Sequence, residues 1–160
     1  MIVPVAAAAD PRLAPYRTVK DNEVARDTDG FIVDGAIALE RLIDTARFPL
    51  VSVFVSERAA ERLHELLARI GPGTPILVAP QAAMDEVVGY HIHRGVLALA
   101  RRLPGKSAAE LLAQHAGAPL TVLVLIGLSN HDNVGACFRN AAALGADAIL
   151  LDESSCDPLY

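Results

Sequence analysis

The sequence contains few of the residues that mark several large classes of protein. It has no tryptophan, only 4% aromatic residues and just two cysteines, Cys137 and Cys156. Two cysteines cannot build a disulfide framework, and neither belongs to a Cys-x-x-Cys pair. A reducing cytoplasm is therefore the expected compartment.

Long apolar runs are also missing. No stretch approaches the roughly 18–20 apolar residues that cross a bilayer. The opening residues 1–9 carry no basic segment ahead of their apolar part, so they make a poor secretory signal. We therefore expect no membrane partner.

Positive charge is scarce, and lysine is scarcer still. The net charge is −5 and the pI is near 5.4, which argues against a nonspecific binder of nucleic acid. Twelve arginines stand against only Lys20 and Lys106. Arginine favours bidentate contact with phosphate, although GC-rich coding explains the same preference equally well. Binding of RNA must therefore depend on a local patch.

The apolar content is ample for a packed core. Hydrophobic residues make up 52% of the 160, enough for one domain or for a small domain plus part of another. Apolar runs alternate with helical patterns, which predicts an α/β fold with a three-layer αβα arrangement in the first half. Strands are expected at residues 50–55, 75–78 and 95–100, and helices at 36–46, 57–70 and 81–87.

Two details of this half are open to a direct check. The helix over residues 36–46 should turn Ile37, Leu39, Leu42 and Ile43 inward. Pro4, Pro11 and Pro15 lie near the N-terminus, and the residues before Pro15 are expected to form a partly mobile lead-in, followed by a short helix over residues 16–26.

The second half is organised around a polar loop and a helix between two apolar runs. Residues 120–128 and 146–151 read as strands buried in a parallel sheet, with a helix from about Asn133 to Gly145 between them. Gly135 and Arg139 are four residues apart, so they share one helix face. Because Gly135 has no side chain, a ligand can approach the helix backbone closely beside the Arg139 cation. The buried stripe should comprise Val134, Phe138, Ala141, Ala142 and Leu144.

These residues carry a resemblance to a known family. The stretch resembles the first signature motif, N-x-G-x-x-x-R-x-A-x-x-x-G, of the SpoU/TrmH class of RNA ribose 2′-O-methyltransferases, in the SPOUT superfamily. The residues that match are Asn133, Gly135, Arg139, Ala141 and Gly145, and the segments 149–152 and 156–160 are also similar to that family. The alternative is that this segment is an ordinary helix between two parallel strands and that Arg139 is simply solvated.

The resemblance extends to the first half and implies a domain organisation. Residues 31–35 match a family strand, and residues 89–98 match a polar loop followed by a strand. The family implies a ribosomal-protein-like substrate-binding domain over residues 1–105, a linker over 106–118, and the start of a SPOUT methyltransferase domain over 119–160. The family builds its cofactor pocket in a later trefoil knot. We therefore expect that the sequence stops before the knot and is inactive alone.

The resemblance also implies roles for individual residues. Arg139 corresponds to the arginine that lies beside the target ribose and phosphate. From its place at the start of the helix, Asn133 is expected to contact the substrate or to fix Arg139, with simple capping of the helix as the alternative. Gly135 would admit the RNA backbone. The implied cofactor is S-adenosylmethionine, with its pocket beyond Tyr160, and the implied partner is structured tRNA or rRNA. Family members are usually homodimers.

A loop in the first half is a second candidate site. Tyr90, the pair His91 and His93, and Arg94 combine rings that stack on unpaired bases with a cation for phosphate. An ordinary solvated loop remains the alternative, and a metal site is not expected because no third ligand lies nearby. Two other functions stay open for the whole chain: a non-catalytic RNA-binding module, and a metabolic enzyme whose motif arose by chance.

Overall fold

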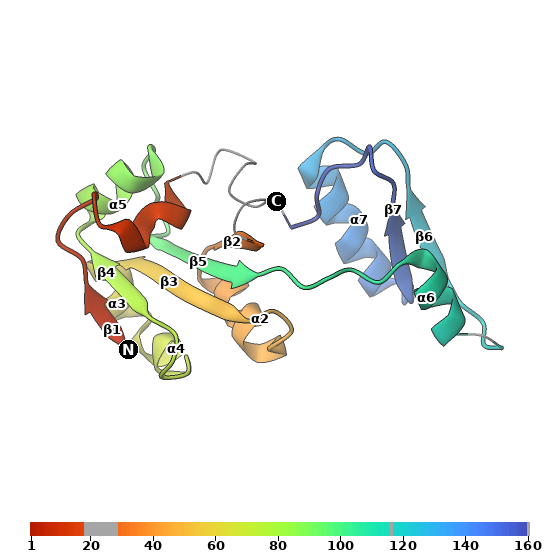
Figure 1. Ribbon diagram of the computed structural model, residues 1–160, viewed down its shortest axis with the longest axis horizontal. Helices are drawn as coiled ribbons and strands as arrows, with labels where there is room; N and C mark the ends of the chain where they lie inside the picture. Colours follow the sequence, from red (N-terminus) through yellow and green to blue (C-terminus); the bar gives the residue numbers. More distant parts are fainter. Residues whose placement is uncertain (18–28, 116, 160) are drawn as a thin grey trace. The chain divides into compact units, whose positions relative to one another are not determined.

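The computed structural model describes residues 1–17, 29–115 and 117–159. The chain divides into two compact units, Met1–Leu103 and Pro104–Tyr160, each with its own sheet (Figure 1). Helices and strands alternate in both, so the expected mixed α/β fold is confirmed. Among the helices described, none has the length and apolar content needed to cross a bilayer.

Unit 1 contains a five-stranded mixed sheet in the order β1-β4-β3-β5-β2. β1, β4 and β3 pair in parallel, whereas β5 runs antiparallel to both β3 and β2. The three strands expected from periodicity and the one expected from the resemblance are all present. The strands are β1 (Ile2–Pro4), β2 (Gly30–Asp34), β3 (Leu50–Ser56), β4 (Ile76–Ala79) and β5 (Val96–Arg101).

Helices pack on both faces of this sheet (Figure 1). Alternate residues of β3 explain why: Phe54 faces one apolar cluster, while Val53 and Val55 face the other. The first cluster includes residues of η1 (Pro11–Tyr16) and α5 (Gln81–Val88). The second includes residues of α2 (Ala36–Thr45), α3 (Glu57–Arg62) and α4 (His64–Ala68).

Two helix predictions in unit 1 need correction. Ile37 was expected to face inward but is 79% exposed, because Leu39 and Leu42 already fill the narrow stripe of α2 that meets the sheet. The single helix expected over residues 57–70 is two helices that meet at Leu63, whose φ of −107° and ψ of 20° are not helical. Ser56 caps the first of them, accepting a hydrogen bond from the backbone N–H of Ala59.

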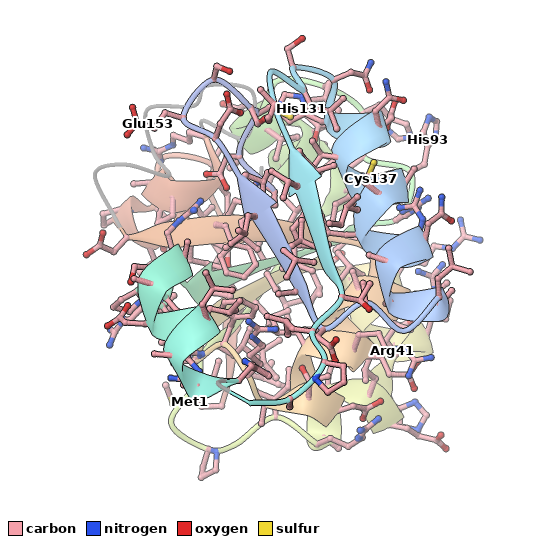
Figure 2. The ribbon with its side chains drawn as sticks, turned by 90° about the vertical axis from the view of Figure 1, so that its right-hand side faces the viewer. Met1, Arg41, His93, His131, Cys137 and Glu153 are labelled. Atoms are coloured by element: carbon pink, nitrogen blue, oxygen red, sulfur yellow. The ribbon has the colours of Figure 1, made fainter. Side chains whose placement is uncertain are left out.

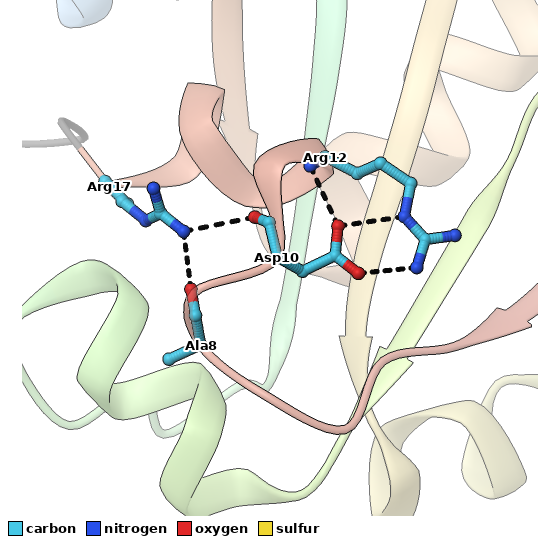
Figure 3. A network of polar contacts seen from close by, with 4 residues as sticks. All are labelled: Ala8, Asp10, Arg12 and Arg17. Atoms are coloured by element: carbon cyan, nitrogen blue, oxygen red, sulfur yellow. Dashed lines mark hydrogen bonds and ion pairs between the residues drawn. The ribbon is translucent and has the colours of Figure 1, made fainter.

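The expectation of a partly mobile lead-in before Pro15 is wrong. β1 pairs with β4, and η1 buries Leu13 and Tyr16 completely. Asp10 caps η1 and accepts hydrogen bonds from the backbone N and Nε of Arg12, both at 2.9 Å (Figure 3). Hydrogen bonding from the Arg12 side chain lowers the pKa of Asp10 to about 2. The helix expected over residues 16–26 falls almost entirely outside the described residues.

Tyr16 fixes this N-terminal segment to the sheet. Its hydroxyl lies 2.7 Å from Oγ of Ser52, which is itself buried, and its ring packs 5.2 Å from the ring of Phe54. Burial raises the pKa of Tyr16, so the hydroxyl stays protonated and can donate to Ser52. The hydroxyls of Tyr16 and Ser52 thus each have a hydrogen-bond partner, although neither reaches water.

Unit 2 contains α6 (Ala108–Gln114) and a strand-helix-strand unit formed by β6 (Val122–Leu125), α7 (His131–Ala143) and β7 (Ala148–Leu151). β6 and β7 pair in parallel, which confirms the predicted crossover. The predicted burial of both strands is wrong in part, since Val124 and Ile126 are exposed. This sheet has only two strands, and α7 covers too little of its surface to bury both of them.

The same limit corrects the predicted stripe of α7. Val134 and Ala141 are buried as expected, but Ala142 and Phe138 are exposed and Leu144 is 87% exposed. A sheet of two strands contacts only a narrow strip along a helix, about one residue wide on each turn. Val134 and Ala141 fill that strip.

Truncating a buried residue of η1 tests whether the N-terminal segment belongs to the core. We expect Leu13→Ala to lower the free energy of unfolding by about 2–5 kcal/mol in denaturant titrations. The matched control is Ile37→Ala, which removes an exposed side chain and should change stability by less than about 0.5 kcal/mol. Equal, small effects of both variants would contradict the packing of η1.

Candidate functional site

The loop before α7 ends in a side-chain cap. Oδ1 of Asn130 accepts a hydrogen bond from the backbone N of Asn133 at 2.9 Å, so the helix begins at His131, two residues earlier than expected. Gly145 ends the segment with a φ of 76°, as predicted. Figure 2 shows His131 at the N-terminal end of α7 and Cys137 further along the same helix.

Gly135 and Arg139 form the feature that the sequence singled out. A Cβ atom built on Gly135 would lie 3.2 Å from Nη1 of Arg139, so the guanidinium folds back over the bare backbone of the preceding turn. The Arg139 side chain is exposed. Among the described residues it has no hydrogen-bond or ion-pair partner, so its charge is available to a ligand.

Asn133 lies in the first turn of α7 but is not the cap. Its backbone N–H is satisfied by Asn130, and its exposed side chain makes no hydrogen bond to Arg139 or to another described residue. Successive helix residues are about 100° apart. Asn133 and Arg139 therefore lie on different faces, about 9 Å apart along the axis.

Asp152 connects the loops that follow the two strands, a role that the sequence did not suggest. Its Oδ1 accepts hydrogen bonds from the backbone N of Gly127 at 3.0 Å and from Ser155 Oγ at 2.5 Å, and its Oδ2 accepts from Ser154 Oγ. Ser155 Oγ in turn accepts from the N–H of Leu128. The hydrogen bonds from Ser154 and Ser155 hold the pKa of Asp152 well below its usual range.

Asp152 follows directly after β7, where a carboxylate is commonly solvated. The signal that could have identified it is the Asp-x-Ser-Ser order, since an aspartate at the start of a turn accepts from residues two and three positions later. The bonds to Gly127 and Ser155 hold together the two loops at the carboxyl ends of β6 and β7. This is the edge of a parallel sheet where ligands bind.

A pocket of about 330 Å³ lies between β6 and the C-terminal half of α7. Val122, Leu123, Ala141 and Leu144 make most of its wall, with Asn140 among its few polar residues. Such a wall offers few partners for a charged ligand. The pocket therefore suits an apolar group.

The second candidate group lies in unit 1, in residues 89–95, which we call the histidine loop. Gly95 has a φ of 64°, and a Cβ there would lie 2.5 Å from Ser56 Oγ, so only glycine fits. The backbone N of Ser56 donates to the carbonyl of Gly95, and Arg62 donates to the carbonyl of Arg94. The loop is therefore held at its C-terminal end.

The structure brings Tyr90, His93 and Arg94 into this one loop. His93 is exposed and packs edge-on against the ring of His91, with centroids 4.7 Å apart. Tyr90 is half-buried, and burial together with the negative charge of Asp34 raises its pKa. No group of three or more potential metal ligands occurs among the described residues.

Arg94 lies over a second glycine. A Cβ on Gly35 would lie 3.1 Å from both Cδ and Nη1 of Arg94. Gly35 is the N-cap of α2, and no side chain caps that helix. An arginine beside uncapped helix amides is a favourable environment for phosphate.

Comparisons with known proteins agree with this fold and these motifs. No family model matches the chain. An uncharacterised tRNA/rRNA methyltransferase of Mycobacterium tuberculosis is 38% identical over 157 residues, which are 94% of this chain and 51% of the relative. The 23S rRNA (guanosine-2′-O-)-methyltransferase RlmB of Vibrio cholerae is 33% identical over 119 residues, 72% of this chain and 47% of that protein.

Solved structures share the fold. An S-adenosylmethionine-bound rRNA methyltransferase from Sinorhizobium meliloti superposes with a TM-score of 0.73 at 18% identity, over 99% of this chain and 57% of that one. The SpoU methyltransferase AviRb from Streptomyces viridochromogenes, in complex with S-adenosylmethionine, gives 0.71 at 15% identity, over 94% and 56%.

The chain spans about half the length of the curated relatives it matches. Over that shared length, identity above 30% covers nearly all of its residues and includes the strand-helix-strand motif that the structure contains. Over the length that it spans, the chain is thus similar in sequence to curated RNA methyltransferases, and its fold is that of SpoU methyltransferases.

Proposed function

We propose that the chain is part of an RNA methyltransferase that moves a methyl group from S-adenosylmethionine to a ribose 2′-hydroxyl of tRNA or rRNA. Residues 1–105 form its substrate-binding domain, of the ribosomal-protein-like αβα type, and residues 106–118 its linker. Residues 119–160 form the first part of its SPOUT domain, which continues into a trefoil knot. The complete protein is a cytoplasmic homodimer in this proposal.

The observation that carries this proposal is the exposed Arg139 guanidinium over Gly135. A free guanidinium presents a planar fork of donors that matches two phosphate oxygens. The missing side chain at Gly135 lets a sugar-phosphate backbone approach the helix closely. Both features serve a ribose-phosphate ligand, and neither is needed for packing.

Arg139 acts in this proposal through position and charge. An arginine stays protonated in proteins, so it is a poor base. It can orient the phosphate beside the target ribose and stabilise the negative charge that develops on the 2′-oxygen. Asn133, at the end of the same helix, contacts the substrate, where the helix amides also favour an anion.

S-adenosylmethionine supplies the electrophilic methyl group when bound. The described residues of unit 2 do not fit it: the pocket beside β6 has an almost entirely apolar wall and lacks partners for a carboxylate, an amine and an adenine. In this proposal the trefoil knot builds the cofactor pocket, and the chain alone is expected to be inactive.

The histidine loop is the proposed RNA contact in unit 1. Tyr90 and His93 stack on unpaired bases, and Arg94 binds phosphate beside the N-terminus of α2. This patch gives an acidic chain a local site for RNA. The alternative is that the chain is only a binding module, in which case RNA binding persists and no methyl transfer occurs in the full-length protein.

The role of Arg139 is tested by a methylation assay with the full-length protein. We expect Arg139→Ala to lower the transfer rate by roughly 10²- to 10³-fold, because a donor aimed at developing charge is lost. Arg41→Ala removes an exposed arginine from α2 and should leave the rate unchanged. An undiminished rate in a folded Arg139→Ala protein would remove Arg139 from the mechanism.

Gly135→Ala separates function from stability, since the two should change in opposite directions. Alanine stabilises a helix interior by roughly 1 kcal/mol relative to glycine. The new Cβ would crowd Nη1 of Arg139 and displace the guanidinium, so methylation should fall by roughly 10- to 100-fold. Thermal unfolding and the same assay measure both effects. A stabilised variant with full activity would contradict the proposed geometry.

The phosphate contact of Arg94 is tested by the salt dependence of RNA binding. Arg94→Ala should weaken binding to single-stranded RNA and make the slope of log K against log salt shallower by about 0.7, the value for one lost phosphate contact. The control is again Arg41→Ala. An unchanged slope would show that Arg94 does not bind phosphate.

A further inference from the structure

We propose that Asp85 is a positioning residue that holds His91 and His93 in the arrangement that stacks on unpaired RNA bases. This inference rests on the RNA-binding role proposed above for the histidine loop. It adds to that role a carboxylate that lies outside the loop, and it states how the two histidines of the loop are held.

One carboxylate receives three hydrogen bonds at the start of the loop. Asp85 Oδ2 accepts from Nδ1 of His91 at 2.6 Å. Its Oδ1 accepts from the backbone N of Ile92 at 3.1 Å and from Nε2 of Gln81 at 2.7 Å. Gln81 also donates to the carbonyl of Ile92, at 3.1 Å. Both backbone polar groups of Ile92 are therefore bound to side chains of α5.

These bonds fix the direction of the neighbouring rings. Ile92 is buried in the cluster between the sheet and α5, so it anchors the middle of the loop. His91 and His93, on either side of Ile92, are both exposed. The Asp85 bond sets the ring of His91, and that ring meets the ring of His93 at 88°. Asp85 thus positions His93 through His91.

The place of Asp85 in the chain argues against a merely solvating role. It lies in the second half of α5, where an acidic side chain opposes the helix dipole, and it lies near a loop that must attract RNA. Both effects are unfavourable. Hydrogen bonding from His91 keeps its pKa below the usual value, so the carboxylate is ionised and can accept all three bonds. Its neighbour Glu86 is exposed and makes no such bond to described residues.

Loss of the Asp85 charge and loss of its positioning role should change the affinity for RNA in opposite directions, so one experiment separates them. Loss of one negative charge near the loop should by itself tighten RNA binding. Loss of the three hydrogen bonds should weaken it, because rings that are not held in place lose stacking energy. Asp85→Ala and Asp85→Asn remove the same charge, but asparagine keeps an oxygen that accepts from Ile92 and Gln81, and its amide N–H can donate to Nδ1 of His91 in the other tautomer.

The experiment measures the affinity of the 160-residue chain for a short uridine-rich RNA single strand, and for the same strand in a duplex, by fluorescence anisotropy. We expect Asp85→Ala to bind the single strand about tenfold more weakly, since stacking on a base is worth about 1–3 kcal/mol. Duplex binding, which depends on phosphate contacts, should change by less than about twofold. Asp85→Asn and the charge-matched control Glu86→Ala should stay within about twofold of the unmodified chain for both probes.

Two outcomes overturn the inference while the proposed function stands. One is single-strand binding by Asp85→Ala that equals or exceeds that of the unmodified chain. The other is an equal loss for the duplex, which would indicate a general defect. Absence of any single-strand binding by the unmodified chain would overturn the RNA-binding role of the loop together with this inference. A failure of methylation alone leaves the inference intact.

A second variant covers the case in which Asp85→Ala does not fold, as judged by thermal unfolding. His91→Phe keeps an aromatic ring on an exposed position but cannot bond to Asp85. It should also bind the single strand about tenfold more weakly, because the ring is present but not held. Full affinity of His91→Phe would overturn the inference.

Discussion

In both units an arginine side chain lies over a glycine, and the candidate sites depend on that contact. Arg139 covers Gly135 on α7, and Arg94 covers Gly35 at the start of α2. A methyl group at either glycine would fall 3.1–3.2 Å from the guanidinium and move it. The absence of a side chain therefore sets where each positive charge is placed. Arg94 also lies beside the first turn of α2, where anions are favoured.

The acidic composition is compatible with these sites because two of the nearby carboxylates each accept several hydrogen bonds. Asp85 receives three donors from α5 and the histidine loop, and Asp152 receives donors from Gly127, Ser154 and Ser155. A carboxylate that several donors surround presents less negative potential to a ligand. It also fixes the backbone on which the ligand-binding groups are mounted. The net charge of −5 is thus a poor guide to the potential at either site.

Local periodicity predicted the strands and helices well, and non-local contacts account for the errors. The pattern in residues 120–151 gave the parallel crossover and the glycine that ends it. The N-terminal segment was misjudged because its proline-rich sequence has no period and its partner, β4, lies about 70 residues away. The exposure of Leu144 follows from the number of strands beside α7, which no local pattern encodes. Asp85 and Asp152 look like ordinary surface acids until the loops they hold are folded.

The motif helix shows how a site conflicts with the stability of the element that carries it. Gly135 costs α7 roughly 1 kcal/mol relative to alanine, and the helix buries only Val134 and Ala141 among its own residues. Such a helix needs support from its ends. Asn130 caps its first turn, and the bonds of Asp152 hold the loop that leads into it. Gly135 is unfavourable inside a helix, whereas the segments on either side follow the usual preferences for caps and turns. This pattern is expected where a residue is kept for binding rather than for folding.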